Sequence, residues 1–106
     1  GYFTKYGDGG VDLQPIGSLT KSEVRIWART LGLPEIIVFR TPTAGFWEGQ
    51  TDEGEMGLSY DIIDKYLVGE KVPLEASRKI ERLHAISEHK RQMPYKIELP
   101  KLERLD

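Results

Sequence analysis

Near the start of the sequence, three glycines fall within four positions. Gly7, Gly9 and Gly10 surround Asp8 and follow the aromatic-rich run Gly1-Tyr2-Phe3-Thr4-Lys5-Tyr6. Glycine lets the backbone turn tightly, or take a positive φ, where a Cβ atom would clash. Such a turn can bring the backbone close to a ligand. The stretch therefore predicts an interior part of a binding site, although its spacing is neither a Walker loop nor a G-x-G-x-x-G fingerprint.

Length and composition are those of a small globular protein. The chain has 106 residues, which allows one domain at most. Hydrophobic residues make up 39% and charged residues 30%. This composition is too apolar for a disordered segment and too charged for a membrane segment. No apolar run approaches the ~20 residues of a spanning helix, and no signal peptide follows Gly1. We therefore expect a soluble, cytoplasmic protein that does not bind membranes.

Charge and cysteine content narrow the chemistry further. Cysteine is absent, which excludes disulfides, thiolate metal sites and thiol nucleophiles. A net charge of −2 gives no broad electrostatic reason to bind nucleic acid, so we expect no such partner. The chain does carry one local basic patch, His89-Lys90-Arg91, near its end.

The clearest secondary-structure signal is a helix start at Thr20. Thr20 and Glu23 form the Thr-x-x-Glu capping box, and Gly32 is a natural C-terminal stop. One face of this helix is apolar and should be buried, and its residues are Val24, Trp27, Ala28 and Leu31.

Three more helices are predicted downstream. Pro34 suits the first turn of a short helix through Phe39, although its β-branched residues would tolerate a strand equally well. Ser59 can cap a helix that ends near Gly69. The last helix starts at Val72-Pro73 and is bounded by Pro94; we expect His84 on its half-buried face to be structural.

Three segments lack a helical period. Residues 11–16 alternate apolar and polar side chains as a short strand would, until Pro15 confines that strand to an edge or an end. Residues 40–58 form a glycine-rich loop that carries Phe46 and Trp47, which suggests a mobile lid over a site or, alternatively, a permanently packed connection. Residues 95–106 form a C-terminal arm.

Several motifs, in order along the chain, resemble those of the ammonia-dependent NAD synthetase family. The run Phe3-Thr4-Lys5-Tyr6-Gly7-Asp8-Gly9-Gly10 is nearly identical to the family's. The others are Thr20-Lys21, Pro42-Thr43-Ala44-Gly45, Gly49-Gln50-Thr51-Asp52-Glu53, Leu58-Ser59-Tyr60-Asp61 with Ile63-Asp64, and Glu88-His89-Lys90-Arg91. The resemblance covers nearly the whole chain but only the C-terminal part of the family's polypeptide. The family's Ser-Gly-Gly-x-Asp-Ser pyrophosphate loop has no counterpart in the sequence.

This resemblance implies a fold class, a reaction and its partners. The fold is α/β, of the adenine-nucleotide alpha-hydrolase type found in N-type ATP pyrophosphatases, with this chain holding its later, mainly helical part. The enzyme is a ligase that adenylates deamido-NAD with ATP and then amidates it with ammonia, giving NAD, AMP and pyrophosphate. Mg²⁺ takes part in the complete enzyme, but its ligands lie upstream in the family, and members are homodimers.

The same resemblance assigns ligand contacts residue by residue. It implies ATP contacts for Lys21 and Thr43, and deamido-NAD contacts for Lys5, Asp12, His89 and Lys90. No residue is implied as a catalytic nucleophile. From its position alone, Lys21 would complete a phosphate site at the unsatisfied N–H groups of a helix start, although most lysines are simply solvated.

Simpler interpretations of other charged residues stay open. Lys5 and Asp12 could form a local ion pair, and His89-Lys90-Arg91 could merely complement the helix dipole. The acidic residues Asp52, Glu53 and Glu55 could bind Mg²⁺ or charge the start of a short helix capped by Thr51.

The activity of the chain also has alternatives. One is a non-catalytic nucleotide-binding or dimerisation fragment that is inactive by itself and needs an N-terminal half. Others are a purely structural interaction domain and a glutamine-dependent relative in which another domain supplies ammonia.

Overall fold

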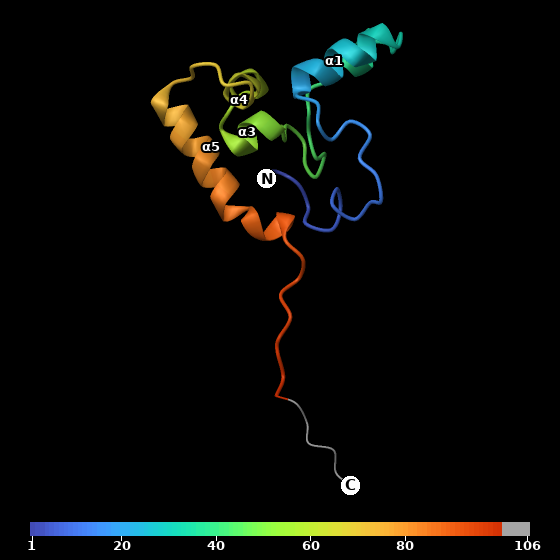
Figure 1. Cartoon of the computed structure of the whole chain (residues 1–106). Helices are drawn as coiled ribbons and strands as arrows, with labels where there is room; N and C mark the ends of the chain where they lie inside the picture. The colour runs from blue at the N-terminus through green and yellow to red at the C-terminus, as the bar shows by residue number, and fades with distance from the viewer. Residues whose placement is uncertain (101–106) are drawn as a thin grey trace.

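In a computed structural model that describes residues 1–100, short helices follow one another between turns and loops (Figure 1). The helices are α1 (Lys21–Thr30), α2 (Glu35–Val38), α3 (Asp52–Met56), α4 (Tyr60–Leu67), α5 (Leu74–Ile86) and the 3-10 helix η1 (Glu88–Arg91). The first part of the predicted C-terminal arm, residues 95–100, is exposed and has no regular structure; residues 101–106 of that arm lie outside the described residues.

The predicted capping box at the start of α1 is confirmed. The Thr20 side chain accepts a hydrogen bond from the Glu23 amide, and the Glu23 carboxylate accepts one from the Thr20 amide at 2.7 Å. Gly32 follows the helix with a φ of +74°, as its role as a stop requires. The prediction that the apolar face of α1 is buried is wrong for its second half, because Trp27 is 58% and Leu31 72% exposed. Within residues 1–100 no element covers that end of the face.

The other predicted helices form, with one shifted boundary. Ser59 caps α4 by accepting a hydrogen bond from the Ile62 amide at 3.2 Å, and α2 is a helix rather than a strand. The last helix does not run to Pro94, because α5 ends at Ile86 and η1 follows. Arg91 donates to the His84 carbonyl oxygen at 2.7 Å, which satisfies a backbone acceptor at the end of α5. His84 itself is exposed, so its predicted place on a half-buried face is wrong.

The strand predicted for residues 11–16 does not form, and no strand occurs within residues 1–100. Successive turns replace it, closed by hydrogen bonds from the Gly17 amide to the Gln14 carbonyl and from the Leu19 amide to the Ile16 carbonyl, both 3.1 Å. A strand needs a neighbouring strand to accept its backbone hydrogen bonds, and none of the described elements provides one.

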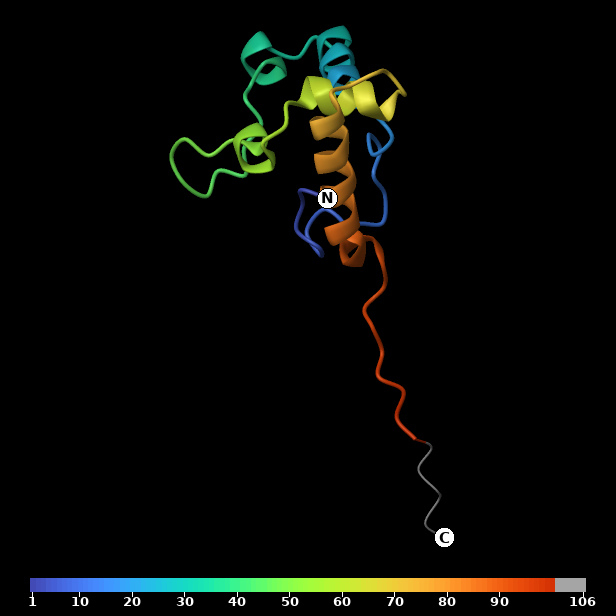
Figure 2. The ribbon, with the colours of Figure 1, turned by 90° about the vertical axis from the view of Figure 1, so that its left-hand side faces the viewer.

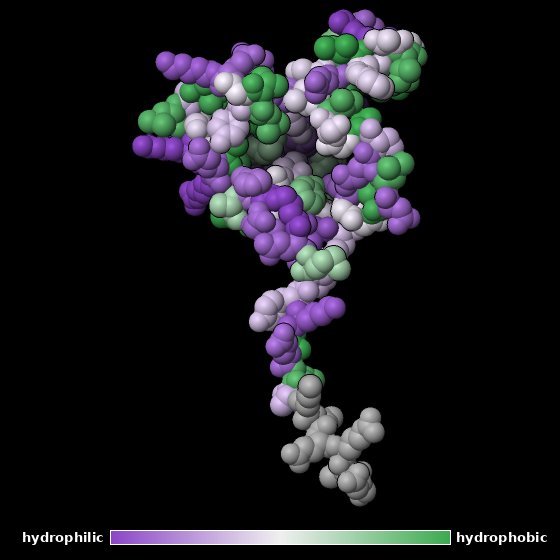
Figure 3. All heavy atoms as spheres, in the orientation of Figure 1, coloured by the Kyte–Doolittle hydropathy of each residue, from purple (hydrophilic) through white to green (hydrophobic). Residues whose placement is uncertain are grey.

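The helices pack in a chain of neighbours rather than around one large core. Helix α1 packs against α2 and α4, and α4 packs against α5. In the side view α5 runs down the centre, and the loop before α3 projects to one side (Figure 2). Within residues 1–100 only three apolar side chains are buried, namely Val38, Leu58 and Ala76. Apolar residues are instead spread over the surface (Figure 3).

The overall shape is elongated. The radius of gyration is 19.1 Å, whereas a compact domain of this size has a value of about 13 Å. Residues 92–100 extend away from the helices (Figure 1), and the longest dimension is 70 Å. No helix within residues 1–100 has both the length and the apolar character needed to cross a membrane.

A buried carboxylate joins α4 to the start of α1. Asp64 is only 9% exposed, and it accepts hydrogen bonds from the Ser22 amide at 2.8 Å and the Ser22 hydroxyl at 2.6 Å. It also accepts a longer bond, 3.3 Å, from the Lys21 amide. A negative charge at a helix N-terminus is favoured by the helix dipole, so this contact fixes where α1 begins and how it meets α4.

We predict that Asp64→Ala loosens α1 selectively. Loss of hydrogen bonds to a charged group costs about 1.5 to 3 kcal/mol, so amides of α1 should exchange roughly 10- to 100-fold faster. The control is Asp61→Ala on the same helix, because Asp61 is exposed and, among residues 1–100, pairs only with Lys65 across 2.7 Å. Hydrogen exchange of the 106-residue chain measures both variants. Equal exchange in α1 for the two would contradict the role given to Asp64.

Candidate functional site

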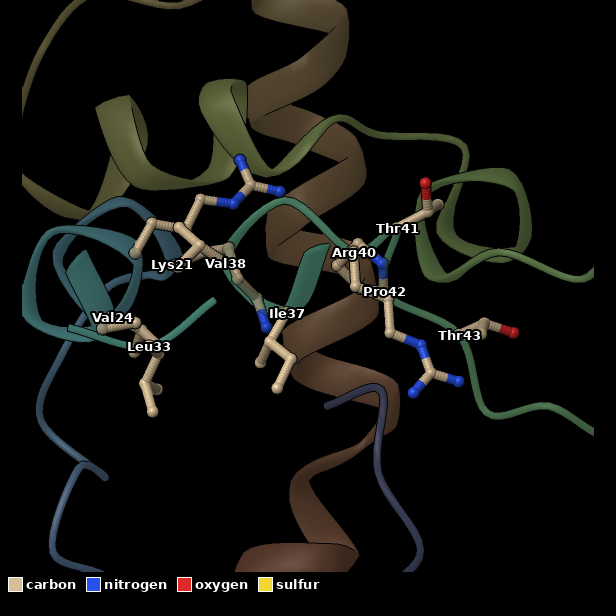
Figure 4. A pocket seen from close by; sticks show the side chains of 11 residues that line it. Lys21, Val24, Leu33, Ile37, Val38, Arg40, Thr41, Pro42 and Thr43 are labelled. Carbon is tan, nitrogen blue, oxygen red and sulfur yellow. The ribbon is translucent and has the colours of Figure 1, made fainter. Parts of the chain in front are cut away.

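A cavity of about 440 Å³ lies between α1 and the segment that leads into the long loop. Lys21 and Val24 face it from α1, and the segment containing Thr43 forms the opposite wall (Figure 4). Ile37 and Val38 from α2 lie between these two walls. The two residues implied for ATP, Lys21 and Thr43, therefore line one cavity although 21 residues separate them in sequence.

The expectation that the backbone N–H groups at the start of α1 are unsatisfied is wrong. The amides of Lys21 and Ser22 already donate to the Asp64 carboxylate, and the Glu23 amide donates to Thr20. An incoming phosphate would compete with a carboxylate held inside the protein. Cationic side chains, Lys21 and Arg25, rather than the helix end, are thus what α1 offers to an anion in the cavity.

The Lys21 ammonium has an aromatic neighbour on α4. Its Nζ atom lies 4.8 Å from the centre of the Tyr60 ring, within range of a cation–π interaction. The Tyr60 hydroxyl in turn donates a 2.6 Å hydrogen bond to Asp52 of α3. Burial, and then this hydrogen bond, raise the pKa of Tyr60 above its ordinary value of 10.0.

A second cavity, about 510 Å³, lies beside the first. Thr43 lines it as well, together with aromatic side chains from the start of the chain and from the loop, namely Tyr2, Phe3, Phe46 and Trp47. Its polar lining includes Asp8, Asp52 and Lys90. Thr43 is thus common to both cavities, at the point where a ligand could extend from one into the other.

Lys90 ties the end of the helical region to the N-terminal stretch. Its ammonium donates to the backbone carbonyl oxygens of Phe3 at 2.7 Å and Gly1 at 2.9 Å, and lies 5.4 Å from the centre of the Phe3 ring. His89 lies next to it and lines a third cavity of about 320 Å³, beside Tyr2 and Met56. The structure therefore brings His89 and Lys90 to the N-terminal stretch, as a shared ligand would require.

Lys5 and Asp12 do not meet in this way. They form no salt bridge with each other within residues 1–100, and neither lines the second cavity. Lys5 lies 5.4 Å from the Tyr6 ring, and Asp12 is exposed. Their simpler interpretation as an ion pair is therefore wrong.

The glycine turn beside them is tight for a steric reason. A Cβ atom on Gly10 would meet the Tyr6 carbonyl oxygen at 2.4 Å, and one on Gly9 would meet the Lys5 carbonyl oxygen at 2.9 Å. Neither glycine has a positive φ. Close backbone approach, rather than a left-handed conformation, thus requires glycine here.

The acidic residues after Thr51 open a helix. Thr51 accepts a hydrogen bond from the Gly54 amide at 3.0 Å and caps α3, which confirms the helix-start interpretation. Within the described residues no group of three or more His, Cys, Asp or Glu side chains is arranged to hold a metal ion.

The long loop is fastened at its base and open at its tip. The Asp52 amide donates to the Pro42 carbonyl at 2.9 Å, and the buried Gln50 accepts from the Phe46 amide at 2.8 Å. At the tip, Phe46 is 79% and Trp47 56% exposed. The two loop aromatics therefore do not belong to the core of this structure.

Comparison with known proteins places these features in a family. The profile of the NAD synthase family matches residues 1–94. The chain belongs to this family. An NH(3)-dependent NAD(+) synthetase of Alkaliphilus metalliredigens is 60% identical over 94 residues, 89% of this chain and 38% of that protein. One from Saccharolobus solfataricus is 46% identical over 108 aligned positions, 89% of this chain and 39% of that protein.

A solved structure shows the same arrangement. NMN synthetase from Francisella tularensis superposes with a TM-score of 0.84 at 42% identity, over 92% of this chain and 41% of that one. The likeness agrees with the fold of NAD synthetases. The chain spans about two fifths of the length of the relatives that it matches.

Sequence reasoning missed Asp64, Tyr60 and Asp52 as residues that shape the site. One signal was present, because Asp64 interrupts the apolar face of α4 between Tyr60 and Leu67. A charged residue on an apolar face requires a buried partner. The identity of that partner, the start of α1, depends on how the two helices pack.

We predict a pH dependence of stability that comes from Tyr60. Because its pKa is raised on folding, the folded state keeps the phenol proton that the unfolded chain loses above pH 10.0. This contribution is therefore present below pH 10.0 and is lost as the pH rises above it. In urea unfolding, Tyr60→Phe should show a smaller alkaline loss of stability than the parent. Tyr95→Phe, on the exposed arm, is the control and should not differ from the parent.

Proposed function

We propose that the chain forms part of an ammonia-dependent NAD synthetase, a ligase that makes NAD from deamido-NAD, ATP and ammonia. One observation carries the proposal. Lys21 and Thr43, which the motifs pair with ATP, line the same cavity. The identity of 60% to a protein named NH(3)-dependent NAD(+) synthetase supports it.

The proposed reaction needs alignment and charge stabilisation rather than a protein nucleophile. The carboxylate oxygen of the nicotinate group attacks the α-phosphorus of ATP, and pyrophosphate leaves. Ammonia then attacks the acyl carbon, AMP leaves, and the nitrogen loses a proton to give the amide. The Lys21 ammonium and the Thr43 hydroxyl would hold the nucleotide, and a cationic group lowers the energy of charge that builds up during transfer.

Deamido-NAD would bind in the region of the second and third cavities. Lys90, His89 and the N-terminal stretch meet there, and aromatic side chains line the walls. Lys90 already uses two of its ammonium hydrogens on backbone carbonyls, so we propose that it also holds the N-terminal stretch in place for the ligand. Lys5 and Asp12 would contact the ligand from the glycine turn.

The remaining parts of the reaction would come from outside this chain. We propose that the strands of the α/β fold, the Ser-Gly-Gly-x-Asp-Ser loop and the Mg²⁺ ligands belong to the portion of the family enzyme that the 106 residues do not span. We also propose a cytoplasmic homodimer. In this proposal the chain by itself is inactive, which agrees with the alternative of a fragment that binds nucleotide only with its remaining half.

A second candidate differs in the acid substrate. The structural relative is named an NMN synthetase, which points to a mononucleotide in place of the dinucleotide. The higher identity is to proteins named NAD synthetases, 60% against 42%, and we therefore favour deamido-NAD.

The proposal is tested in a chimera. Residues 1–94 replace the aligned 94 residues of the Alkaliphilus metalliredigens relative. We expect this protein to convert deamido-NAD to NAD with ATP and ammonia, and to use nicotinate mononucleotide poorly. Lys21→Ala should lower kcat/KM for ATP by roughly 10- to 100-fold, since loss of a charged hydrogen bond costs about 1.5 to 3 kcal/mol.

Lys65→Ala is the matched control, because Lys65 is an exposed helical lysine that does not line the first cavity. It should leave the ATP dependence unchanged. The 106-residue chain alone serves as the blank. A folded chimera that makes no NAD would contradict the proposed function, and an unchanged ATP dependence in Lys21→Ala would contradict the ATP site.

We further propose that the tip of the loop within residues 40–58 acts as a lid. Gly45 and Gly49 have φ values of +72° and +80°, and between them Phe46 and Trp47 stand exposed on the rim of the second cavity. An aromatic pair there gains burial when the loop closes over a ligand. Closure would also keep water away from the acyl adenylate.

Hydrogen exchange of the chimera tests the lid. Amides of residues 43–49 should exchange fast without ligand and become protected when ATP and deamido-NAD are both bound. Amides of α5, which forms part of the helical body, should change little. Equal exchange of residues 43–49 in the two states would mean that the loop does not close.

A further inference from the structure

Two side chains one turn apart on α4 act on the same residue. Tyr60 and Asp64 are separated by four positions, so they lie on one face of the helix. Asp64 holds the backbone amide of Lys21 at 3.3 Å and that of Ser22 at 2.8 Å. The Tyr60 ring lies 4.8 Å from the Lys21 ammonium. One face of α4 therefore contacts Lys21 at both ends, backbone and side-chain tip.

We propose that Tyr60 is a positioning residue for ATP binding, which holds the Lys21 ammonium toward the first cavity while Asp64 holds its backbone. The inference rests on the proposed function, because it presumes that Lys21 binds ATP. Tyr60 does not itself line that cavity, so its effect passes through Lys21.

A lysine needs such help more than most residues do. Its side chain has four rotatable bonds, and binding a phosphate would freeze all of them. An aromatic face that already attracts the ammonium reduces the number of conformations that remain to be lost on binding. Tyr60 thus raises affinity for ATP without touching it.

The orientation of Tyr60 is itself fixed by α3. Its hydroxyl donates to the Asp52 carboxylate at 2.6 Å, and its backbone amide donates to the Glu53 carboxylate at 2.8 Å. The Asp52 amide also donates to the Pro42 carbonyl, immediately before Thr43. Asp52 thereby links the two sides of the cavity. On one side it bonds Tyr60, which contacts Lys21, and on the other it bonds Pro42, which precedes Thr43.

The test measures ATP kinetics of the chimera with substitutions at Tyr60. Tyr60→Leu removes the ring and should raise KM for ATP by roughly three- to tenfold, with kcat little changed. Tyr60→Phe keeps the ring but loses the bond to Asp52, and its KM should lie between those of the parent and Tyr60→Leu. Asp52→Asn is the matched companion, because it keeps an oxygen acceptor for the hydroxyl and should act less strongly than Tyr60→Phe.

A double-mutant cycle separates positioning from general damage. If Tyr60 acts through Lys21, adding Tyr60→Leu to Lys21→Ala should raise KM for ATP no further than Lys21→Ala does alone. If Tyr60→Leu caused only general structural damage, it would raise KM for ATP by the same factor in the parent and in Lys21→Ala. Thermal melting confirms that each variant is folded. If Tyr60→Leu does not fold, Tyr60→Phe completes the same cycle.

The outcomes distinguish failure of this inference from failure of the proposed function on which it rests. If Lys21→Ala leaves KM for ATP unchanged, the ATP assignment fails and the inference fails with it. If Lys21→Ala raises KM but the folded Tyr60 variants do not, or if the two effects add, only the positioning role is overturned.

Discussion

The described structure depends on one buried anion, the carboxylate of Asp64. It occupies the position at the start of α1 where a helix otherwise attracts an external anion, and it comes from α4. This single contact sets the register between the two helices. It also occupies the backbone amides at the start of α1 that could otherwise bind a phosphate, and it holds the backbone of Lys21 in place. Because only three apolar side chains are buried in the described part of the chain, buried polar contacts of this kind largely determine how the helices pack.

Local features of this fold were predictable, because each depends on few neighbouring residues. The caps at Thr20, Thr51 and Ser59 and the stop at Gly32 all form as predicted. Features that depend on a distant partner were not predictable. The apolar and polar alternation of residues 11–16 is compatible with a strand, but a strand exists only beside another strand. The exposure of Trp27 and Leu31 likewise reflects what packs on α1, which periodicity cannot reveal.

The candidate site shows the same difference between features that short motifs predict and features that depend on distant contacts. Short motifs identified Lys21, Thr43, His89 and Lys90, and the structure gathers the first two around one cavity and the last two beside the N-terminal stretch. Tyr60 and Asp52 belonged to recognised motifs as well, yet their contacts with Lys21 and Pro42 could not be read from spacing. The ligand contacts are proposed from motif similarity, whereas the residues that hold those side chains in place could be found only from the structure.

The hydrogen bond between the Asp52 amide and the Pro42 carbonyl has a geometric consequence for the loop that it closes. Nine residues lie between these two anchors. A chain of that length, doubled back on itself, reaches roughly 17 Å from its base at full stretch. Any atom that the indole of Trp47 covers must lie within this radius plus the length of the side chain. The anchored base thus limits how far residues 43–51 can reach, and the length of this segment bounds the region that their side chains can contact.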